Sequence, residues 1–154
     1  MARRNHFNKQ DLKNIQEFIN LIDSDIKVYK GSKFECDIYE EKIYIGNKRL
    51  DRITQLFCKW LDTQTNIHPN YCIIAILHEL GHIMTNTEEL QDNREMLDNL
   101  YSLMYESGNL QEEEYFTNYF EIPAEYQATM WGVEFYKENK SLCDKLAEML
   151  GVSY

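Results

Sequence analysis

Residues 78 to 82 read His-Glu-Leu-Gly-His, and side chains of these types at this spacing can perform metal-dependent hydrolysis. On a helix, residues four apart lie on one face, so His78 and His82 can direct two imidazole nitrogens at one metal ion. Glu79 follows the first histidine, where its carboxylate can reach a metal-bound water and act as a general base. The H-E-x-x-H spacing therefore predicts a zinc site with two ligands and a base.

The residues around this motif favour a metal site over two surface histidines. A five-residue pattern with three fixed positions arises by chance in many proteins. Here residues 72–77 before the motif are apolar, which predicts a partly buried helix. Burying polar groups without compensation costs several kcal/mol, so a buried histidine pair beside a glutamate needs a reason. Gly81 lies inside the same helix, where glycine costs about 1 kcal/mol relative to alanine and often allows another backbone to approach.

A catalytic zinc takes three protein ligands and keeps one position for water or substrate, so a third ligand must come from elsewhere in the chain. No histidine follows His82, and His68 lies about three helical turns before His78, too far to join. We therefore predict a carboxylate from a later helix, either Glu125 or Glu121. Pro123 suits the first turn of a helix, which places Glu125 on the rigid element and favours it.

The residues after Glu125 favour close packing of this helix on the motif helix. Ala128 and Gly132 follow Glu125 at i+3 and i+7, so small residues form a smooth stripe on one face. This stripe would let the two helices approach and bring the third ligand to the histidines.

Hydrophobic periodicity predicts the elements that position these residues. An amphipathic helix is followed by three short strands and then by a series of helices. Strand and helix do not alternate, which argues against a doubly wound parallel sheet and indicates an α+β fold. The predicted helices span residues 8–23, 50–61, 70–84, 88–106, 110–120, 123–137 and 141–150, and the predicted strands span residues 26–29, 34–39 and 42–45.

Turn and cap residues predict several boundaries. Glu40 and Glu41 would form the turn before the last strand. Ser141 is expected to cap the last helix and Gly151 to end it. In the helix over residues 50–61, the residues expected on the buried side are Ile53, Leu56, Phe57 and Trp60.

Length and composition exclude several classes of protein. The 154 residues fit one domain over 1–154, and a hydrophobic content of 44% can build a core. A net charge of −10 argues against nucleic-acid binding, which depends on basic patches. No window approaches the roughly 20 apolar residues of a membrane span, and no secretion signal is seen. Four cysteines without C-x-x-C spacing indicate reduced thiols, so we expect a cytoplasmic protein.

The motifs resemble those of the short gluzincin metallopeptidases, and are most similar to the ImmA/IrrE type of phages and mobile elements. The resemblance rests on Leu-His-Glu-Leu-Gly-His at 77–82 and Pro-x-Glu-x-x-Ala at 123–128, after a helix and a small sheet. It implies a minimal zincin-like fold over residues 10–137, with the motif histidines and Glu125 binding Zn²⁺ and Glu79 as the base. It also implies a protein or peptide substrate, in some members a repressor.

The predicted reaction is peptide hydrolysis, in which Glu79 takes a proton from water and later delivers it to the leaving amine. The oxyanion also needs a hydrogen-bond donor, and Tyr71, Tyr119 and Tyr126 are candidates. Each histidine should donate its second ring N–H to an acceptor, and Glu121 is a candidate for that role.

Two other functions fit the same residues. One is a metal-stabilised, catalytically silent binding protein that uses the acidic helices of residues 88–114 as a partner surface. The other is a metal hydrolase with a non-peptide substrate. We prefer the peptidase, because a charge run on a helix is usually a solvated face.

Overall fold

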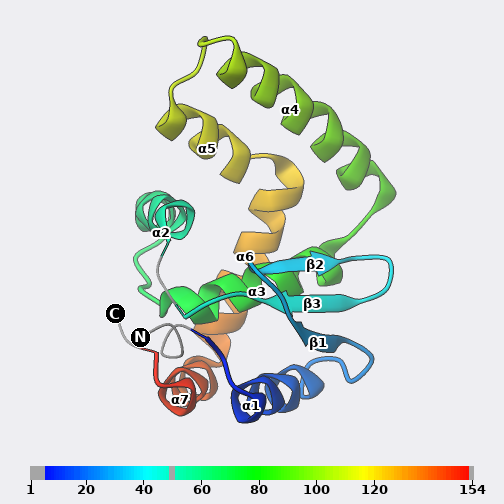
Figure 1. The fold of residues 1–154 in the computed structure, drawn as a ribbon, viewed down its shortest axis with the longest axis vertical. Helices are drawn as coiled ribbons and strands as arrows, with labels where there is room; N and C mark the ends of the chain where they lie inside the picture. The colour runs from blue at the N-terminus through cyan, green and yellow to red at the C-terminus, as the bar shows by residue number, and fades with distance from the viewer. Residues whose placement is uncertain (1–5, 49–50, 153–154) are drawn as a thin grey trace.

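A computed structural model of the protein describes residues 6–48 and 51–152. In these ranges the chain forms an α+β fold with an N-terminal helix, a three-stranded sheet and six further helices, as predicted (Figure 1). The helices are α1 Lys9–Asn20, α2 Arg52–Gln64, α3 Tyr71–Thr85, α4 Glu88–Glu106, α5 Glu112–Phe120, α6 Pro123–Glu138 and α7 Lys140–Leu150. The strands are β1 Lys27–Lys30, β2 Glu35–Asp37 and β3 Lys42–Ile45.

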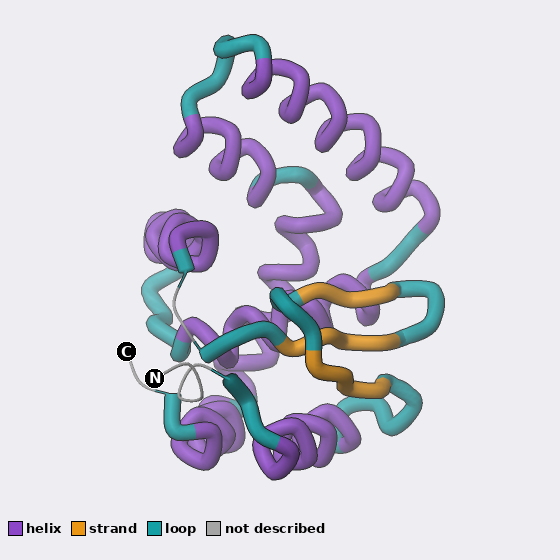
Figure 2. Tube along the Cα trace, viewed as in Figure 1, coloured by secondary structure: helices purple, strands orange, loops and turns teal. Residues whose placement is uncertain are grey.

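The sheet is mixed, with the strand order β1-β3-β2 (Figure 2). The central strand β3 pairs in parallel with β1, where Val28 lies opposite Ile43, and antiparallel with β2, where Cys36 lies opposite Ile43. The predicted turn at Glu40 and Glu41 is confirmed, and Glu41 has a φ of 54°, in the left-handed region. β2 is therefore an edge strand of this sheet.

Helix α3 lies in the centre of the protein, between the sheet and α6. Asn70 caps its start, because the side chain accepts a hydrogen bond from the backbone N–H of Cys72. Most of its apolar residues are buried, and each buried leucine or isoleucine contributes about 1.5–3 kcal/mol relative to exposure. The fully buried large side chains of α3 are Ile73, Ile74, Ile76, Leu77 and Leu80. This burial anchors α3 in the core and so holds the His-Glu-Leu-Gly-His motif in a fixed position.

Small residues allow α3 and α6 to pack closely. A Cβ on Gly81 would lie 2.1 Å from the carbonyl oxygen of Ala128, a distance that real Cβ atoms never reach. A Cβ on Gly132 would lie 3.0 Å from the Cβ of Leu77. The predicted stripe of small residues is confirmed, and it brings the start of α6 next to the motif.

The prediction for Ile53 is wrong, because this side chain is 54% exposed. The inner face of α2 instead consists of Leu56, Phe57, Trp60 and Leu61, which pack in a small cluster with Phe120 of α5. Ile53 lies one turn outside this contact and lines an open cleft. Leu50, the predicted start of this helix, lies outside the described residues.

The prediction that Ser141 caps the last helix is also wrong. α7 begins at Lys140 after Asn139, which is also the C-cap of α6, so the two helices share one connecting residue. The backbone N–H of Asn139 bonds to the carbonyl of Phe135 while its own carbonyl accepts from Cys143. Gly151 ends α7 as predicted, with a φ of 68°.

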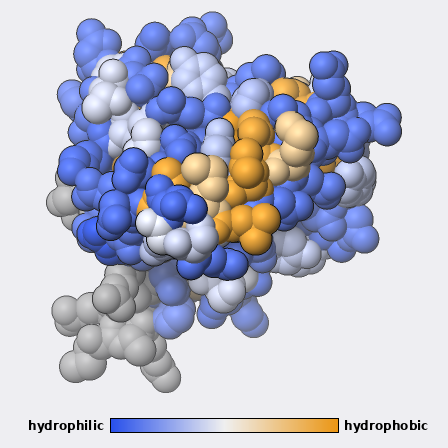
Figure 3. Space-filling model, turned by 90° about the horizontal axis from the view of Figure 1, so that it is seen from above, coloured by the Kyte–Doolittle hydropathy of each residue, from blue (hydrophilic) through white to orange (hydrophobic). Residues whose placement is uncertain are grey.

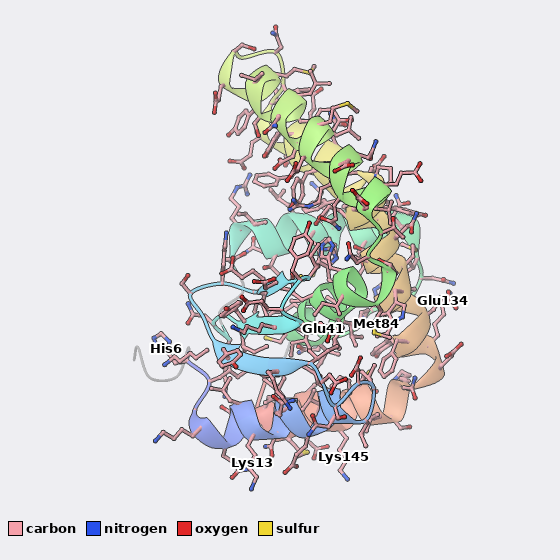
Figure 4. The ribbon with its side chains drawn as sticks, turned by 90° about the vertical axis from the view of Figure 1, so that its right-hand side faces the viewer. His6, Lys13, Glu41, Met84, Glu134 and Lys145 are labelled. Atoms are coloured by element: carbon pink, nitrogen blue, oxygen red, sulfur yellow. The ribbon has the colours of Figure 1, made fainter. Side chains whose placement is uncertain are left out.

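Helices α4 and α5 lie at one end of the molecule, and α1 and α7 lie at the other (Figure 1). Figure 4 shows Lys13 of α1 and Lys145 of α7 at that second end, where the two helices contact each other. α4 has 19 residues and none of them is buried. Within residues 6–48 and 51–152, no helix combines the length and apolar character needed to cross a membrane.

Candidate metal centre

The structure brings His78 and His82 of α3 together with Glu125 of α6. The Nε2 atoms of the two histidines lie 3.1 Å apart. Oε1 of Glu125 lies 3.2 Å from Nε2 of His78, and Oε2 lies 3.1 Å from Nε2 of His82. All three side chains are largely buried, with exposed fractions of 14%, 9% and 3%. This cluster could hold a metal ion.

The spacing of the donor atoms in this cluster suits a small metal ion. Ligand atoms about 2.0–2.1 Å from a tetrahedral zinc lie about 3.3 Å from one another. The two histidine nitrogens lie 3.1 Å apart, and a different oxygen of Glu125 faces each of them at 3.1 to 3.2 Å, close to that value. Two histidines and one glutamate are also a donor set found in catalytic zinc sites.

A threonine on α6 fixes the orientation and tautomer of His78. The hydroxyl of Thr129 donates to the backbone carbonyl of Glu125 at 3.0 Å and lies 2.9 Å from Nδ1 of His78. Its single proton is used in the first bond, so it can only accept from the ring. Nδ1 of His78 therefore carries a proton, and Nε2 is the ring nitrogen that faces Glu125 and His82.

The charges in the cluster favour a bound cation. Burial alone would raise the pKa of the Glu125 carboxyl, but hydrogen bonds from His78 and His82 outweigh it and hold the pKa well below the usual range. Burial would lower the pKa of His78, but the carboxylates of Glu125 and Glu79 outweigh it and raise that pKa. A carboxylate held in its ionised form beside two ring nitrogens is suited to a divalent ion.

The cluster forms part of the lining of an open cleft with a volume of about 960 Å³. Glu79 lies in the same lining and is half-buried, so its carboxylate stands in the cleft beside the candidate ligands. Residues 33–39, which include the edge strand β2, form one wall of the cleft. Residues of α2, α4 and α5 form further walls, and the residues of α3 and Glu125 of α6 complete the lining.

Arg94 of α4 is a residue of this site that sequence reasoning missed. Its Nε donates to Oε2 of Glu125 at 2.8 Å, and its Nη2 donates to the hydroxyl of Tyr119 at 3.1 Å. Arg94 is the one basic residue in the α4 sequence, which also contains six acids. A lone cation in an acidic helix was the signal that could have identified it.

The thiol of Cys36 on β2 was not expected at the site either. Burial and the nearby carboxylate of Glu79 raise the pKa of this thiol, so it stays neutral in the lining of the cleft. Burial raises the pKa of Cys58 to about 11 and the pKa values of Cys72 and Cys143 to about 12. The thiolate is the reactive form of cysteine, so these shifts argue against a cysteine nucleophile.

Glu121 does not take either role predicted for it. Its Oε2 accepts a hydrogen bond from Nε1 of Trp60 at 3.0 Å, and it is not part of the histidine cluster. The preceding residue of the chain ends α5, so Glu121 lies outside α6 and faces α2. The side chain that meets His78 at Nδ1 is Thr129.

Of the three candidate tyrosines, only Tyr119 lines the cleft. The hydroxyl of Tyr71 donates to the carbonyl of Lys48, away from the site. Tyr126 packs its ring edge-on against Trp60. His68 lies 3.2 Å from Asp62 and is exposed, in agreement with its exclusion as a ligand.

Comparison of the chain with protein-family models, curated proteins and solved structures found no match. The chemistry of the site must therefore be argued from its own residues. They form a buried group of two histidines and one glutamate that could hold a metal ion, in an α+β fold with an open cleft.

Proposed function

We propose that the protein is a zinc-dependent peptidase of the short gluzincin type, with His78, His82 and Glu125 as the metal ligands. The observation that carries this proposal is the convergence of two imidazoles and one carboxylate in the lining of an open cleft. A buried structural zinc site would be closed by a fourth protein ligand. The described residues contribute three groups to this cluster, and the cleft gives solvent access.

Zinc at this position would supply a Lewis acid that lowers the pKa of water and polarises a carbonyl group. Glu79 follows the ligand His78 and lines the cleft, so it acts as the general base that takes a proton from the attacking water. The same carboxyl then gives the proton to the leaving nitrogen. The neutral thiol of Cys36 lies in the same cleft lining as this carboxylate.

Tyr119 and Arg94 are suited to stabilise the negative charge that develops on the carbonyl oxygen. Burial raises the pKa of Tyr119, so its hydroxyl stays protonated at neutral pH. That hydroxyl accepts a hydrogen bond from Arg94, which leaves its own proton available for the substrate. Donors already held in place at a developing oxyanion are worth several kcal/mol in such reactions.

A polypeptide is the substrate that best fits the cleft. The cleft runs beside β2, whose outer edge has no partner strand in the described sheet. An extended peptide can pair with such an edge through its backbone, which places its carbonyl groups along the site. By its motif resemblance to the ImmA/IrrE type, we propose that this substrate is a regulatory protein.

The test compares cells that express the wild type with cells that express Glu79→Gln, by mass spectrometry of new protein N-termini. We expect one or a few cleavage products that depend on Glu79, while both purified proteins contain zinc. Glu134→Gln, an exposed substitution on α6, is the matched control and should cleave like the wild type. Identical termini in wild type and Glu79→Gln would refute the peptidase.

A binding protein without catalysis is the second candidate, and one observation favours it. None of the 19 residues of α4 is buried, although the helix contains several large apolar side chains. Binding through α4 does not exclude catalysis, since the exposed Met96, Leu100 and Leu103 do not line the cleft.

A further inference from the structure

The outward face of α4 carries an apolar stripe. Met96, Leu100 and Leu103 are 61%, 48% and 65% exposed. They are spaced by four and three residues, which places them in one row along the helix. Figure 3, which views the molecule from the end that carries α4 and α5, shows a band of hydrophobic side chains across a largely hydrophilic face. Single exposed apolar residues are common, but a contiguous row on one helix marks an interaction site.

This stripe is not the edge of the core or of the metal site. Arg94, which reaches Glu125, precedes Met96 by two residues and so points about 200° away around the helix. α4 therefore has one face toward the cleft and an opposite face toward solvent. The outward face has no function in the proposed hydrolysis.

Carboxylates line one flank of the stripe. Asp92, Glu95 and Glu106 are exposed and lie to one side of the stripe, about 40° to 100° from it around the helix. Glu95, the farthest of the three from the stripe, also lies at the rim of the cleft. None of the three lies in an ion pair with a described cation, although Arg94 is on the same helix. The chain as a whole has a net charge of −10. A second copy of this chain would place acids against acids, which disfavours a dimer through this face.

We propose that the outward face of α4 is a docking site for a basic amphipathic helix of another protein. Apolar side chains of that helix pack on Met96, Leu100 and Leu103, and its lysines or arginines pair with Asp92 and Glu95. Helices bound in this way are anchored by residues at i, i+4 and i+7, which is the spacing of the stripe. The carboxylates beside the stripe set the orientation of the bound helix and speed its association. Salt screens this attraction and so weakens binding.

The probe is a synthetic helical peptide with leucine on one face and lysine along its flanks, labelled for fluorescence anisotropy. We expect saturable binding of one peptide per chain by the full-length protein, with weaker binding at high salt. The triple variant Met96→Ser, Leu100→Ser, Leu103→Ser should bind at least about tenfold more weakly. The double variant Asp92→Lys, Glu95→Lys should do the same, because it reverses the flank.

Matched controls change equivalent groups elsewhere. Leu21→Ser replaces another exposed apolar side chain, which is 69% exposed. Glu17→Lys with Glu138→Lys changes the net charge as much as the flank variant does, at exposed sites on α1 and α6. Both controls should bind the peptide like the wild type.

Three results would overturn the proposal. The first is no saturable binding by the wild type. The second is an equal loss of peptide affinity in the charge control and in the flank variant, because the effect would then come from net charge alone. The third is a wild-type dimer in sedimentation that the triple serine variant abolishes, since the occupant of the face would then be a second copy.

Discussion

Nε of Arg94 donates a hydrogen bond to Oε2 of Glu125 over 2.8 Å, and so joins α4 to the carboxylate that faces the two histidines. The Glu125 side chain is 3% exposed and the Arg94 side chain 31% exposed. An ionised carboxylate at that depth needs positive partners, because the desolvation cost is several kcal/mol. Arg94 is the permanent cation among them.

Arg94→Ala should destabilise the metal-free protein by about 1–2 kcal/mol, less than for a fully buried pair because Arg94 is partly solvated. Added zinc should restore part of the lost stability, since the metal compensates the negative charge of Glu125. Urea unfolding with chelator and with zinc measures both values. Arg52→Ala removes a comparable but exposed contact with Glu112 and should have little effect. Equal effects of the two substitutions would contradict this account.

Gly81→Ala should separate α3 from α6, because its Cβ would lie 2.1 Å from the carbonyl oxygen of Ala128. We expect a loss of about 1–3 kcal/mol in the free energy of unfolding and weaker zinc binding. Gly132→Ala meets atoms of Leu77 at 3.0 to 3.4 Å, a milder contact, and gains helix propensity, so its loss should be clearly smaller. Chemical denaturation and a zinc titration rank the two variants, and similar values for both would contradict the packing argument.

Thr129→Val keeps the shape of the side chain but removes the hydroxyl that lies 2.9 Å from Nδ1 of His78. Losing the acceptor that fixes the His78 tautomer should weaken zinc binding about 10-fold to 100-fold. Thr129→Ser retains the hydroxyl and should bind zinc nearly as the wild type does. Competition with a chromophoric chelator gives the affinities, and an unchanged affinity in the valine variant would exclude this role.

Glu125→Gln and Glu121→Gln separate the two carboxylates that the sequence left as alternatives. We expect the first to lose zinc and the second to keep it, because Glu121 accepts from Trp60. In Glu121→Gln the near-neutral amide can still accept from the indole, so stability should change little. Metal content of both purified variants is the measurement, and the opposite pattern would make Glu121 the ligand.

Local signals in the sequence predicted the elements that hold the site. The bounds of α4 and β3 agree with the prediction, and α3 and α6 agree within one residue at each end. Asn70, Thr87 and Pro123 mark three of these starts through hydrogen bonds or backbone geometry that lie within one helical turn. The choice of Glu125 over Glu121 followed from the position of Pro123.

Contacts between distant segments could not be predicted in the same way. Arg94 precedes Glu125 by 31 residues and Cys36 precedes Glu79 by 43, so no helical or strand period relates them. Ile53 matched the spacing of a buried face but lines the open cleft, where its side chain is 54% exposed. These details depend on how the helices pack around the cleft, and periodicity describes one element at a time.

The most direct test of the proposed metal centre is X-ray absorption at the zinc edge on the purified full-length protein, with metal content measured on the same sample. We predict about one zinc per chain, bound by two imidazole nitrogens and one carboxylate oxygen at about 2.0–2.2 Å. His78→Ala should lose this zinc. Wild-type protein that holds no more zinc than His78→Ala would contradict the metal centre, and a sulfur ligand at about 2.3 Å, from Cys36, would contradict the open site that hydrolysis requires.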